Sequence, residues 1–400
     1  MGVVLKYGGT SVASVDKILG IANHIQSLNI QEPMVIVVSA MGKMTDDLVS
    51  LARTLTDDLH QREVDTLLSI GEQKTIALMA MALKKVGLDA VSLTGAQAGF
   101  ITTSTHTKGV IKDINIDKVN TYLREGKLVV VAGFQGMTES GDITTLGRGG
   151  SDTSAVALAA KLGYRCDIYT DVDGIYTVDP RLFPRAKKMD MISYTECMEM
   201  SLHGASVIET RAVELAKKYQ VDLYIGRSLS KQGSGTRIMK DDYLFENKPI
   251  TGIAVTDDIA MITLKGENQE NQLVSRIFQA ISDANINIDM ISQNIDHLNQ
   301  VVISFSMHHD DLRDFKQLTY NRKDLFEPLH VDMKDRLVKL SLIGVGMASH
   351  FGVASTVFTT LAKANIPFYH VSTSEISISC TIDSRDKSQA VERLAEVFNL

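Results

Sequence analysis

The stretch VLKYGGTSV, Val4–Val12, decides how the start of this chain folds. An apolar run ends on a cation, Lys6, and two glycines and two hydroxyl residues follow. A run of this kind that ends in glycine is typical of a buried strand leading into a tight turn. A cation, unhindered backbone N–H groups and hydroxyls at such a turn can hold a phosphate. The same residues also fit a plain strand-to-helix turn capped by Thr10 or Ser11.

Other apolar runs repeat this pattern, and most of them end in glycine. They are MVIVVSAMG (34–42), DAVSLTG (89–95), LVVVAGFQG (128–136), CDIYTDVDGIY (166–176) and VDLYIG (221–226). Helical patterns at 14–29 and 151–163 lie between them. Near-continuous apolar strands that alternate with helices indicate a parallel sheet covered by helices. In such sheets a ligand binds at the carboxyl ends of the strands, where these glycines fall.

Composition narrows the classes of function. The chain has 400 residues, a formal net charge of −7 and no basic block, which argues against nucleic acid as the main partner. No apolar run approaches the length of a membrane span, and the start, MGVVLKYGG, does not resemble a signal peptide. The three cysteines, Cys166, Cys197 and Cys380, are far apart, and the histidines show no metal-ligand spacing. A reducing cytoplasm fits best.

The pattern changes within residues 228–249, where Gly, Ser, Lys and Asp cluster, and we expect a domain boundary there. The remainder contains a repeat: IFQAISDANINIDMIS (277–292) aligns with VFTTLAKANIPFYHVS (357–372). Apolar runs precede and follow both copies, so each unit is interpreted as β-α-β-β-α-β, a ferredoxin-like arrangement. Two such units usually pack together, because one small sheet leaves an unpaired edge.

Two further clusters carry polar side chains next to glycines. In TTLGRGGSDTSAVALAA (144–160), Arg148 lies between glycines just before a predicted helix, an arrangement suited to binding an anion. The alternative is a flexible loop with a Ser or Asp cap, but an arginine among three glycines is a poor choice for a mere turn. YTDVDGIYTVDPR (169–181) combines an acidic turn with Tyr176 and Arg181, and a solvated turn explains it about as well.

Together these motifs resemble aspartate kinase, of the amino acid kinase superfamily. The similarity runs in order along the whole chain: KYGGTSV, VVSAMGKMTDDL, SIGE, TGAQAGF, VVVAGFQG, GRGGSDTSAVALAA, YTDVDGIYTVDPR and a tail like two ACT domains. It implies a three-layer α/β/α kinase domain with a mainly parallel sheet over 1–245, then ferredoxin-like (βαββαβ) ACT domains at 250–330 and 335–400. In this family one ACT unit is commonly assembled from non-contiguous segments, so the segments of the tail are expected to interleave.

The resemblance implies phosphorylation of the β-carboxylate of L-aspartate by ATP with Mg²⁺, the entry to lysine, threonine, methionine and diaminopimelate synthesis. Lys6 and Asp152 match the catalytic positions, Asp152 organising the lysine. The substrate positions correspond to Ser39, Thr45, Glu72, Arg148, Gly149, Gly150 and Ser151. Arg148 matches the residue that holds the α-carboxylate, and Glu72 the acid near the amino group. The nucleotide positions correspond to Lys6, Tyr7, Gly8, Gly9, Thr170, Asp171, Tyr176 and Arg181. In this interpretation Gly8 and Gly9 bring N–H donors to the phosphates.

Regulation follows from the ACT tail. INIDMISQN (286–294) fits the family, which places an effector site at Asp289, Gln293 and Asn294. Known effectors of the family are lysine, threonine and diaminopimelate. ACT pairs usually form between chains, so a homodimer or larger assembly is expected. The chain departs from the family in GASVIETR (204–211), where relatives have GAKVLHPR and Ser206 replaces a nucleotide-contacting lysine, and in LKGENQENQLV (264–274), where relatives have a KPG-like turn.

Three rival readings remain. The first is another amino acid kinase, for acetylglutamate, glutamate or carbamate; such enzymes lack the paired ACT tail. The second is an amino-acid sensor that kept the fold and lost activity, favoured only by Ser206. The third is a fused kinase–dehydrogenase, although the chain ends at AEVFNL without a second enzyme.

Overall fold

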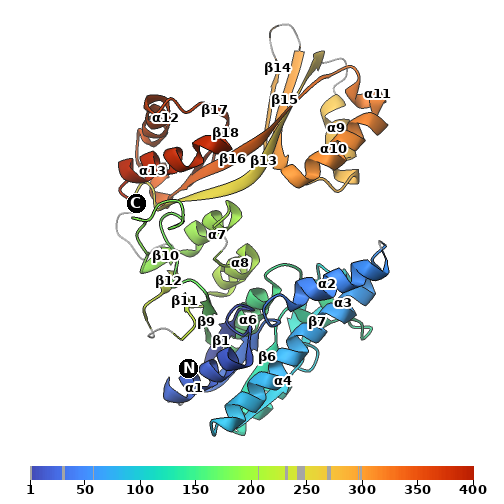
Figure 1. The fold of residues 1–400 in the computed structure, drawn as a ribbon, viewed down its shortest axis with the longest axis vertical. Helices are drawn as coiled ribbons and strands as arrows, with labels where there is room; N and C mark the ends of the chain where they lie inside the picture. Colours follow the sequence, from blue (N-terminus) through green and yellow to red (C-terminus); the bar gives the residue numbers. More distant parts are fainter. Residues whose placement is uncertain are drawn as a thin grey trace. The chain divides into compact units, whose positions relative to one another are not determined.

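The computed structural model describes residues 2–28, 32–56, 58–205, 207–229, 233–240, 248–267, 272–295, 297 and 300–400. Ser206 and part of the predicted linker and of the 264–274 turn lie outside these residues. The chain divides into two units (Figure 1): residues 1–176, 188–201 and 206–245 form the first, and residues 177–187, 202–205 and 246–400 form the second. Among the described residues, no helix has the length and apolarity needed to cross a membrane.

The first unit is built on a large, mainly parallel sheet. Its strands are β1 (Val3–Tyr7), β2 (Met34–Val38), β3 (Ala90–Leu93), β6 (Leu128–Ala132), β9 (Arg165–Thr170), β10 (Met191–Ser193), β11 (Leu223–Arg227) and β12 (Thr236–Met239). Their order is β10-β12-β11-β9-β1-β2-β6-β3, and only the β11–β12 pair is antiparallel. All six apolar runs in the sequence form strands of this sheet, which confirms the predicted α/β class.

Helices cover both faces of that sheet. The helices of the first unit are α1 (Val15–Leu28), α2 (Met44–Leu55), α3 (Gln61–Leu68), α4 (Ile70–Lys85), α5 (Asp117–Arg124), α6 (Gly150–Leu162), α7 (Tyr194–Leu202) and α8 (Thr210–Tyr219). The apolar side chains of α1 and α4 share a core with Leu5 and Tyr7 of β1. Side chains of a strand alternate between faces, so Lys6 points to the opposite face, which α6 covers.

A smaller sheet lies within the same unit and was not predicted. It contains β4 (Phe100–Thr102), β5 (Ile111–Ile114), β7 (Gln135–Met137) and β8 (Ile143–Thr145), in the order β5-β4-β7-β8. Strands of three or four residues are too short to leave an alternation in the sequence. Helix α3 packs against β8.

The second unit is built on one six-stranded sheet. Its strands are β13 (Gly252–Glu267), β14 (Ile288–Ile295), β15 (Gln300–His308), β16 (His330–Ile343), β17 (Phe368–Thr373) and β18 (Ser377–Asp383), in the order β14-β15-β13-β16-β18-β17. Its helices are α9 (Leu273–Asp283), α10 (Leu312–Asn321), α11 (Lys323–Phe326), α12 (Val353–Lys363) and α13 (Lys387–Val397), with 3₁₀ turns at His309–Asp311, Val345–Ser349 and Ser384–Asp386.

Two ferredoxin-like halves share this sheet through the long strands β13 and β16, which Figure 1 shows running side by side. The register between these strands shifts between Thr256 and Ile259 and again before Met261. Residues 259–334 form one half in chain order, with a core under α9, α10 and α11. The other half combines β17, β18 and the end of β16 with residues 252–256, the start of β13. The first strand of the tail therefore contributes to both halves.

Candidate active site

The central strands of the first unit end side by side. Tyr7, the last residue of β1, pairs with Val38 at the end of β2 and with Tyr169 near the end of β9. Val38 in turn pairs with Ala132, the last residue of β6. The loops that follow these strands therefore start at one edge of the sheet, where α/β proteins bind ligands. Most of the predicted substrate and nucleotide residues lie in or beside these loops.

A buried ion pair lies at this edge. Lys6 Nζ is 2.5 Å from Asp152 Oδ1, and the two residues are 6% and 9% exposed. Asp152 lies in the first turn of α6, where the helix dipole favours a negative charge. Both charges have lost most of their hydration, so each depends on the other. The structure thus brings together Lys6 and Asp152, which are far apart in the sequence.

The turn after β1 packs closely against the turn after β2. A Cβ on Gly9 would lie 2.8 Å from Ala40 O, and Gly42 N donates to Gly9 O at 3.0 Å. Only glycine permits this approach. Gly8 N donates to Tyr169 O at 3.1 Å, so its N–H is not free for a phosphate, in contrast to the expectation from the sequence.

The Tyr7 side chain lies in the core and stacks on Tyr169, with ring centroids 5.2 Å apart. Burial raises the pKa of the Tyr7 hydroxyl far above its usual value. Any contact between Tyr7 and a nucleotide would therefore come from its backbone.

The loop before α6 presents Arg148 to solvent. Gly149 follows with φ +64°, a left-handed conformation that favours glycine, and its carbonyl accepts from Asp152 N at 3.0 Å. Arg148 itself is exposed and has no hydrogen bond or ion pair to any residue that the structure describes. A free guanidinium beside a helix N-terminus can bind a carboxylate with two parallel hydrogen bonds.

Two hydroxyls and a buried carboxylate lie near this loop. Ser39 Oγ and Ser151 Oγ are 2.7 Å apart, which joins the end of β2 to the start of α6. Glu72, on α4, is 3% exposed, and its Oε1 accepts from Ala40 N at 2.9 Å. Its Oε2 has no hydrogen-bond partner among the described residues. Thr45 lies in the first turn of α2 and is half-buried.

Burial raises the pKa of Glu72 to about 7, although the hydrogen bond from Ala40 favours the charged form. The free Oε2 is a buried acceptor, and such groups usually have a partner. A ligand ammonium group would supply a donor and the opposite charge, and would lower this pKa.

The nucleotide residues divide between the two units. Thr170 ends β9, and its Oγ1 donates to Asp171 at 2.9 Å. Tyr176 donates to Asp173 at 3.1 Å. Arg181 belongs to the second unit, where its guanidinium pairs with Asp179, with 2.7 Å between the closest atoms. Arg181 is therefore described within the second unit only.

Glu209 is a charged residue near the site that sequence reasoning missed. It precedes α8, and a Cβ on Gly149 would lie only 2.5 Å from Glu209 Cβ. Burial and the nearby Asp152 raise the pKa of its carboxyl, and Arg148 opposes this effect. Its position in GASVIETR, where relatives have a histidine, was the available signal.

The predicted effector residues lie on β14, an edge strand of the second unit. Asp289 forms an ion pair with Lys339, a 4% exposed residue of β16, and Lys339 lowers the pKa of this carboxyl. Gln293 and Asn294 are exposed and pair with Ile303 and Val302 of β15. The three residues lie on one strand, and only Asp289 has a charged partner.

Both units of the chain match known protein families. Residues 1–227 match the amino acid kinase family, and residues 270–321 and 340–398 each match an ACT domain. Aspartokinase 2 of Bacillus subtilis (strain 168) is 45% identical over 400 residues, covering 100% of this chain and 98% of that protein. Aspartokinase of Geobacillus stearothermophilus is 44% identical over 403 residues, with the same coverage of both chains.

Solved structures with the same fold span the whole chain. The Escherichia coli aspartokinase III complex with aspartate and ADP has a TM-score of 0.83 at 23% identity, and covers 99% of each chain. Aspartate kinase from Synechocystis has a TM-score of 0.56 at 38% identity, and covers 100% of this chain and 70% of the other. At 23% identity, the Escherichia coli structure supports only the arrangement of helices and strands.

Proposed function

The chain belongs to the aspartokinases of the amino acid kinase family, and from this premise we propose how its residues transfer the γ-phosphoryl group of ATP to the β-carboxylate of L-aspartate. The observation that carries the proposal is the buried Lys6–Asp152 pair at the strand ends, beside a free Arg148 and a buried Glu72. The product is 4-phospho-L-aspartate, the first intermediate in the synthesis of lysine, threonine, methionine and diaminopimelate. The two full-length relatives described above, at 45% and 44% identity, are both aspartokinases.

The reaction joins two anions. An oxygen of the β-carboxylate attacks the γ-phosphorus, the bond from that phosphorus to the β,γ-bridging oxygen breaks, and ADP leaves. Such transfers depend on positioning and on neutralising charge, with little covalent chemistry for the protein. The Lys6 ammonium supplies positive charge where the two anions meet. Asp152 holds that ammonium in one orientation, and a preorganised charge in a dry site lowers the barrier most.

Substrate recognition uses the two charged groups of an α-amino acid. Arg148 would bind the α-carboxylate, with Ser39, Thr45, Gly149, Gly150 and Ser151 as its polar surroundings. Glu72 would accept from the α-ammonium through Oε2, the buried oxygen that has no hydrogen-bond partner in the described part of the chain. This assignment gives a donor and an opposite charge to an atom that otherwise bears an uncompensated desolvation penalty.

The nucleotide would lie along the turns after β1 and β9, with Gly9, Thr170, Asp171 and Tyr176 as contacts and Arg181 assigned by family resemblance. Mg²⁺ binds few protein groups in kinases and keeps waters and phosphate oxygens as ligands. Among the described residues, no group of three His, Cys, Asp or Glu side chains could hold a metal ion alone. When bound, the ion would neutralise phosphate charge.

We further propose that an amino acid such as lysine, threonine or diaminopimelate binds near Asp289, Gln293 and Asn294 and regulates the kinase unit. The two ferredoxin-like halves support this assignment, because both match ACT domains. We divide the chain into a kinase domain over 1–245 and ACT regions over 250–330 and 335–400, with residues 252–256 contributed to the second ACT fold. A homodimer through the ACT regions and a cytoplasmic location complete the proposal, and the free cysteines Cys166, Cys197 and Cys380 agree with a reducing compartment.

Trapping the acyl phosphate as its hydroxamate tests the reaction. The full chain should form hydroxamate from L-aspartate with ATP and Mg²⁺, and none from L-glutamate. Repeating the assay with lysine, threonine and both together identifies the effector. Folded protein that forms no hydroxamate from aspartate would contradict the proposal and favour the sensor function, and replacing Ser206 with lysine would then be the next variant.

A further inference from the structure

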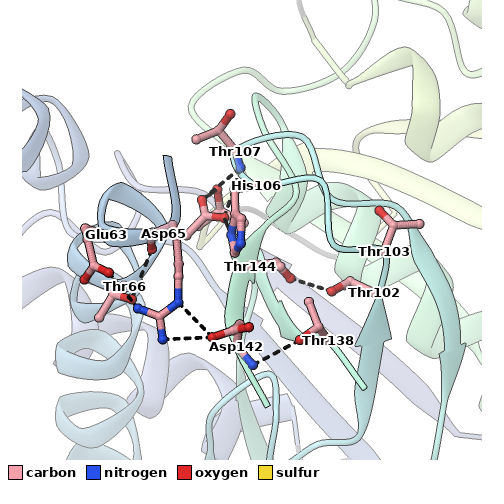
Figure 2. Close-up of polar contacts among 12 residues, drawn as sticks. Glu63, Asp65, Thr66, Thr102, Thr103, His106, Thr107, Thr138, Asp142 and Thr144 are labelled. Atoms are coloured by element: carbon pink, nitrogen blue, oxygen red, sulfur yellow. Dashed lines mark hydrogen bonds and ion pairs between the residues drawn. The ribbon is translucent and has the colours of Figure 1, made fainter. Parts of the chain in front are cut away.

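A buried carboxylate outside the proposed site joins three segments of the first unit. Asp65, on α3, is fully buried. Its Oδ1 accepts from Thr145 Oγ1 at 2.6 Å, and Thr107 N lies 3.0 Å from both carboxylate oxygens. His106 Nδ1 is 2.9 Å from Oδ2. Figure 2 shows His106 and Thr107 above Asp65, with their hydrogen bonds to its carboxylate.

Burial of the Asp65 carboxylate costs free energy, and filling space is not enough to offset this cost. A carboxylate loses its hydration when it is buried, and apolar packing of equal volume often stabilises a fold as well or better. Asp65 has no lysine or arginine partner among the residues described, and its hydrogen bonds instead fix backbone and hydroxyl groups of the loop at 103–109 and of β8. The gain is therefore in the geometry of those segments.

The segments that Asp65 holds lead directly to Arg148. Thr145 ends β8, three residues before Arg148, and its carbonyl accepts from Gly109 N at 2.8 Å. Arg211 donates to Leu146 O at 3.1 Å and to Gly109 O at 3.0 Å. The backbone at residues 145 and 146 is thus held from two sides. Arg148, beyond these contacts, has no side-chain hydrogen bond to any other described residue.

Glu72 lies on α4, the helix that follows α3 along the chain. Helix α3 passes through Ser69 into α4, and Ser69 O accepts from Gln135 Nε2 at 2.9 Å. Glu72 follows Asp65 by seven residues, about two helical turns. The α3–α4 pair therefore connects the clamp on the Arg148 loop to the carboxylate proposed for the substrate ammonium.

We propose that Asp65 is a positioning residue, which sets the Arg148 loop relative to Glu72 so that both reach the charged groups of one α-amino acid. This inference rests on the proposed function. The α-carboxylate and α-ammonium of an amino acid are attached to one carbon, so their separation is fixed. A displacement of about 1 Å in such an arrangement lowers rates by about 10²-fold. Loss of the Asp65 contacts should therefore weaken the use of aspartate and leave the use of ATP unchanged.

The test compares variants of the full chain by calorimetric titration with L-aspartate and by hydroxamate kinetics. Asp65→Asn should raise the Kd and KM for aspartate about 10-fold or more, by the loss of a charged hydrogen bond that orders the loop, while KM for ATP changes less than about 2-fold. Thr145→Val removes the hydroxyl that donates to Asp65. It should also raise the Kd and KM for aspartate, by a smaller factor. This second variant answers the question if Asp65→Asn does not fold.

Asp142→Asn is the matched control. Arg62 lies on the same helix as Asp65, and its Nε donates to Asp142 Oδ1, between β7 and β8, at 2.8 Å. That pair also joins α3 to the β7–β8 hairpin, and among the described residues neither member has a hydrogen bond to Thr145 or Thr107. Asp142→Asn should therefore leave the Kd for aspartate unchanged. A general loosening of the helix would instead weaken both variants alike.

A double variant shows whether Asp65 acts through Arg148. In the Arg148→Ala background, Asp65→Asn should add little to the loss of aspartate affinity. Additive losses of aspartate affinity in the double variant would overturn the inference. It would also be overturned if the Kd for aspartate stayed unchanged in both Asp65→Asn and Thr145→Val, or if Asp142→Asn raised it as much as they do. Wild-type protein that binds aspartate but forms no hydroxamate would contradict the reaction and leave the titrations to decide on Asp65. Wild-type protein that binds no aspartate would overturn both proposals.

Discussion

Each unit of this chain contains a buried lysine paired with an aspartate, Lys6 with Asp152 and Lys339 with Asp289, and these two pairs differ in their exposure to water. In the first unit, the Lys6 and Asp152 side chains are 8% and 12% exposed. In the second, the Lys339 side chain is 5% exposed but that of Asp289 is 52% exposed. The first pair is enclosed on both sides, whereas the second has one partner in solvent.

The difference indicates what each pair can do. Two enclosed charges interact strongly and keep a fixed geometry, which suits charge stabilisation in a reaction. A carboxylate that stays half in water remains accessible to a ligand. The same two residue types therefore fit a catalytic role at the strand ends and a sensing role at a sheet edge.

The largest effect should follow from removing the enclosed cation. Lys6→Met should lower kcat by about 10²–10³-fold or more, because the developing charge on the phosphoryl group loses its fixed partner. Hydroxamate formation at saturating substrates measures this loss, and circular dichroism checks that the variant folds. Near-normal turnover would show that Lys6 is not the bridging charge. Lys17→Met, which changes an exposed lysine after the same turn, is the control.

Arg148→Ala should act mainly on substrate binding. We expect KM for aspartate to rise about 10–100-fold, the range for losing a hydrogen-bonded charge pair of about 1.5–3 kcal/mol. Arg148→Lys should recover only part of this loss, because an ammonium cannot form two parallel bonds to a carboxylate. Initial rates over a range of aspartate concentrations give the answer. A change confined to KM for ATP would place Arg148 on the nucleotide instead.

Glu72→Gln should change how aspartate use depends on pH. With its pKa raised to about 7, Glu72 is protonated below that pH and cannot attract an ammonium group. KM for aspartate in the wild type should therefore fall as pH rises through about 7, and the variant should show a higher KM without this dependence. Profiles of KM between pH 6 and pH 8.5, chosen to span about one unit on either side of that pKa, make the comparison.

The same variant tests the burial of Glu72. The pKa of its carboxyl in the fold lies above the ordinary value of 4.5, so the protein binds this proton more tightly when folded. Stability from this group is full below about 4.5 and is lost as pH rises to about 7. The melting temperature of Glu72→Gln, measured as a function of pH, should lack this loss. If the melting temperatures of the variant and the wild type changed in parallel with pH, the raised pKa of Glu72 would be contradicted.

The smallest effect should come from the pair with one exposed partner. Lys339→Met should change the free energy of unfolding by about 1 kcal/mol or less, because Asp289 remains hydrated. Lys6→Met, in contrast, leaves Asp152 buried without a partner and should cost about 3 kcal/mol. Urea titration of both variants compares them directly. Equal losses would show that exposure of the aspartate does not separate the two pairs.

Much of the fold could be predicted from the sequence. Apolar runs ending in glycine predicted six strands of the large sheet, since buried parallel strands need continuous apolar residues. The repeat around Ala-Asn-Ile predicted two similar halves, and Asn285 and Asn365 do share a left-handed conformation, with φ of 56° and 54°. The four-stranded sheet was missed because its strands are too short for a pattern, and Thr145 and Thr107 gave no local sign of their shared partner.

The sequence by itself determined which residue types stand at which strand ends, because the hydrophobic pattern and the glycines are local signals. The pairing of Lys6 with Asp152 was expected only from the family resemblance, and no local pattern showed it. Nor could the sequence show that Asp65 reaches Thr145, or that residues 252–256 join the end of β16. Those contacts link residues 80 to 146 positions apart. Only the tertiary structure decided them, since burial and hydrogen bonding between distant segments depend on how whole elements pack.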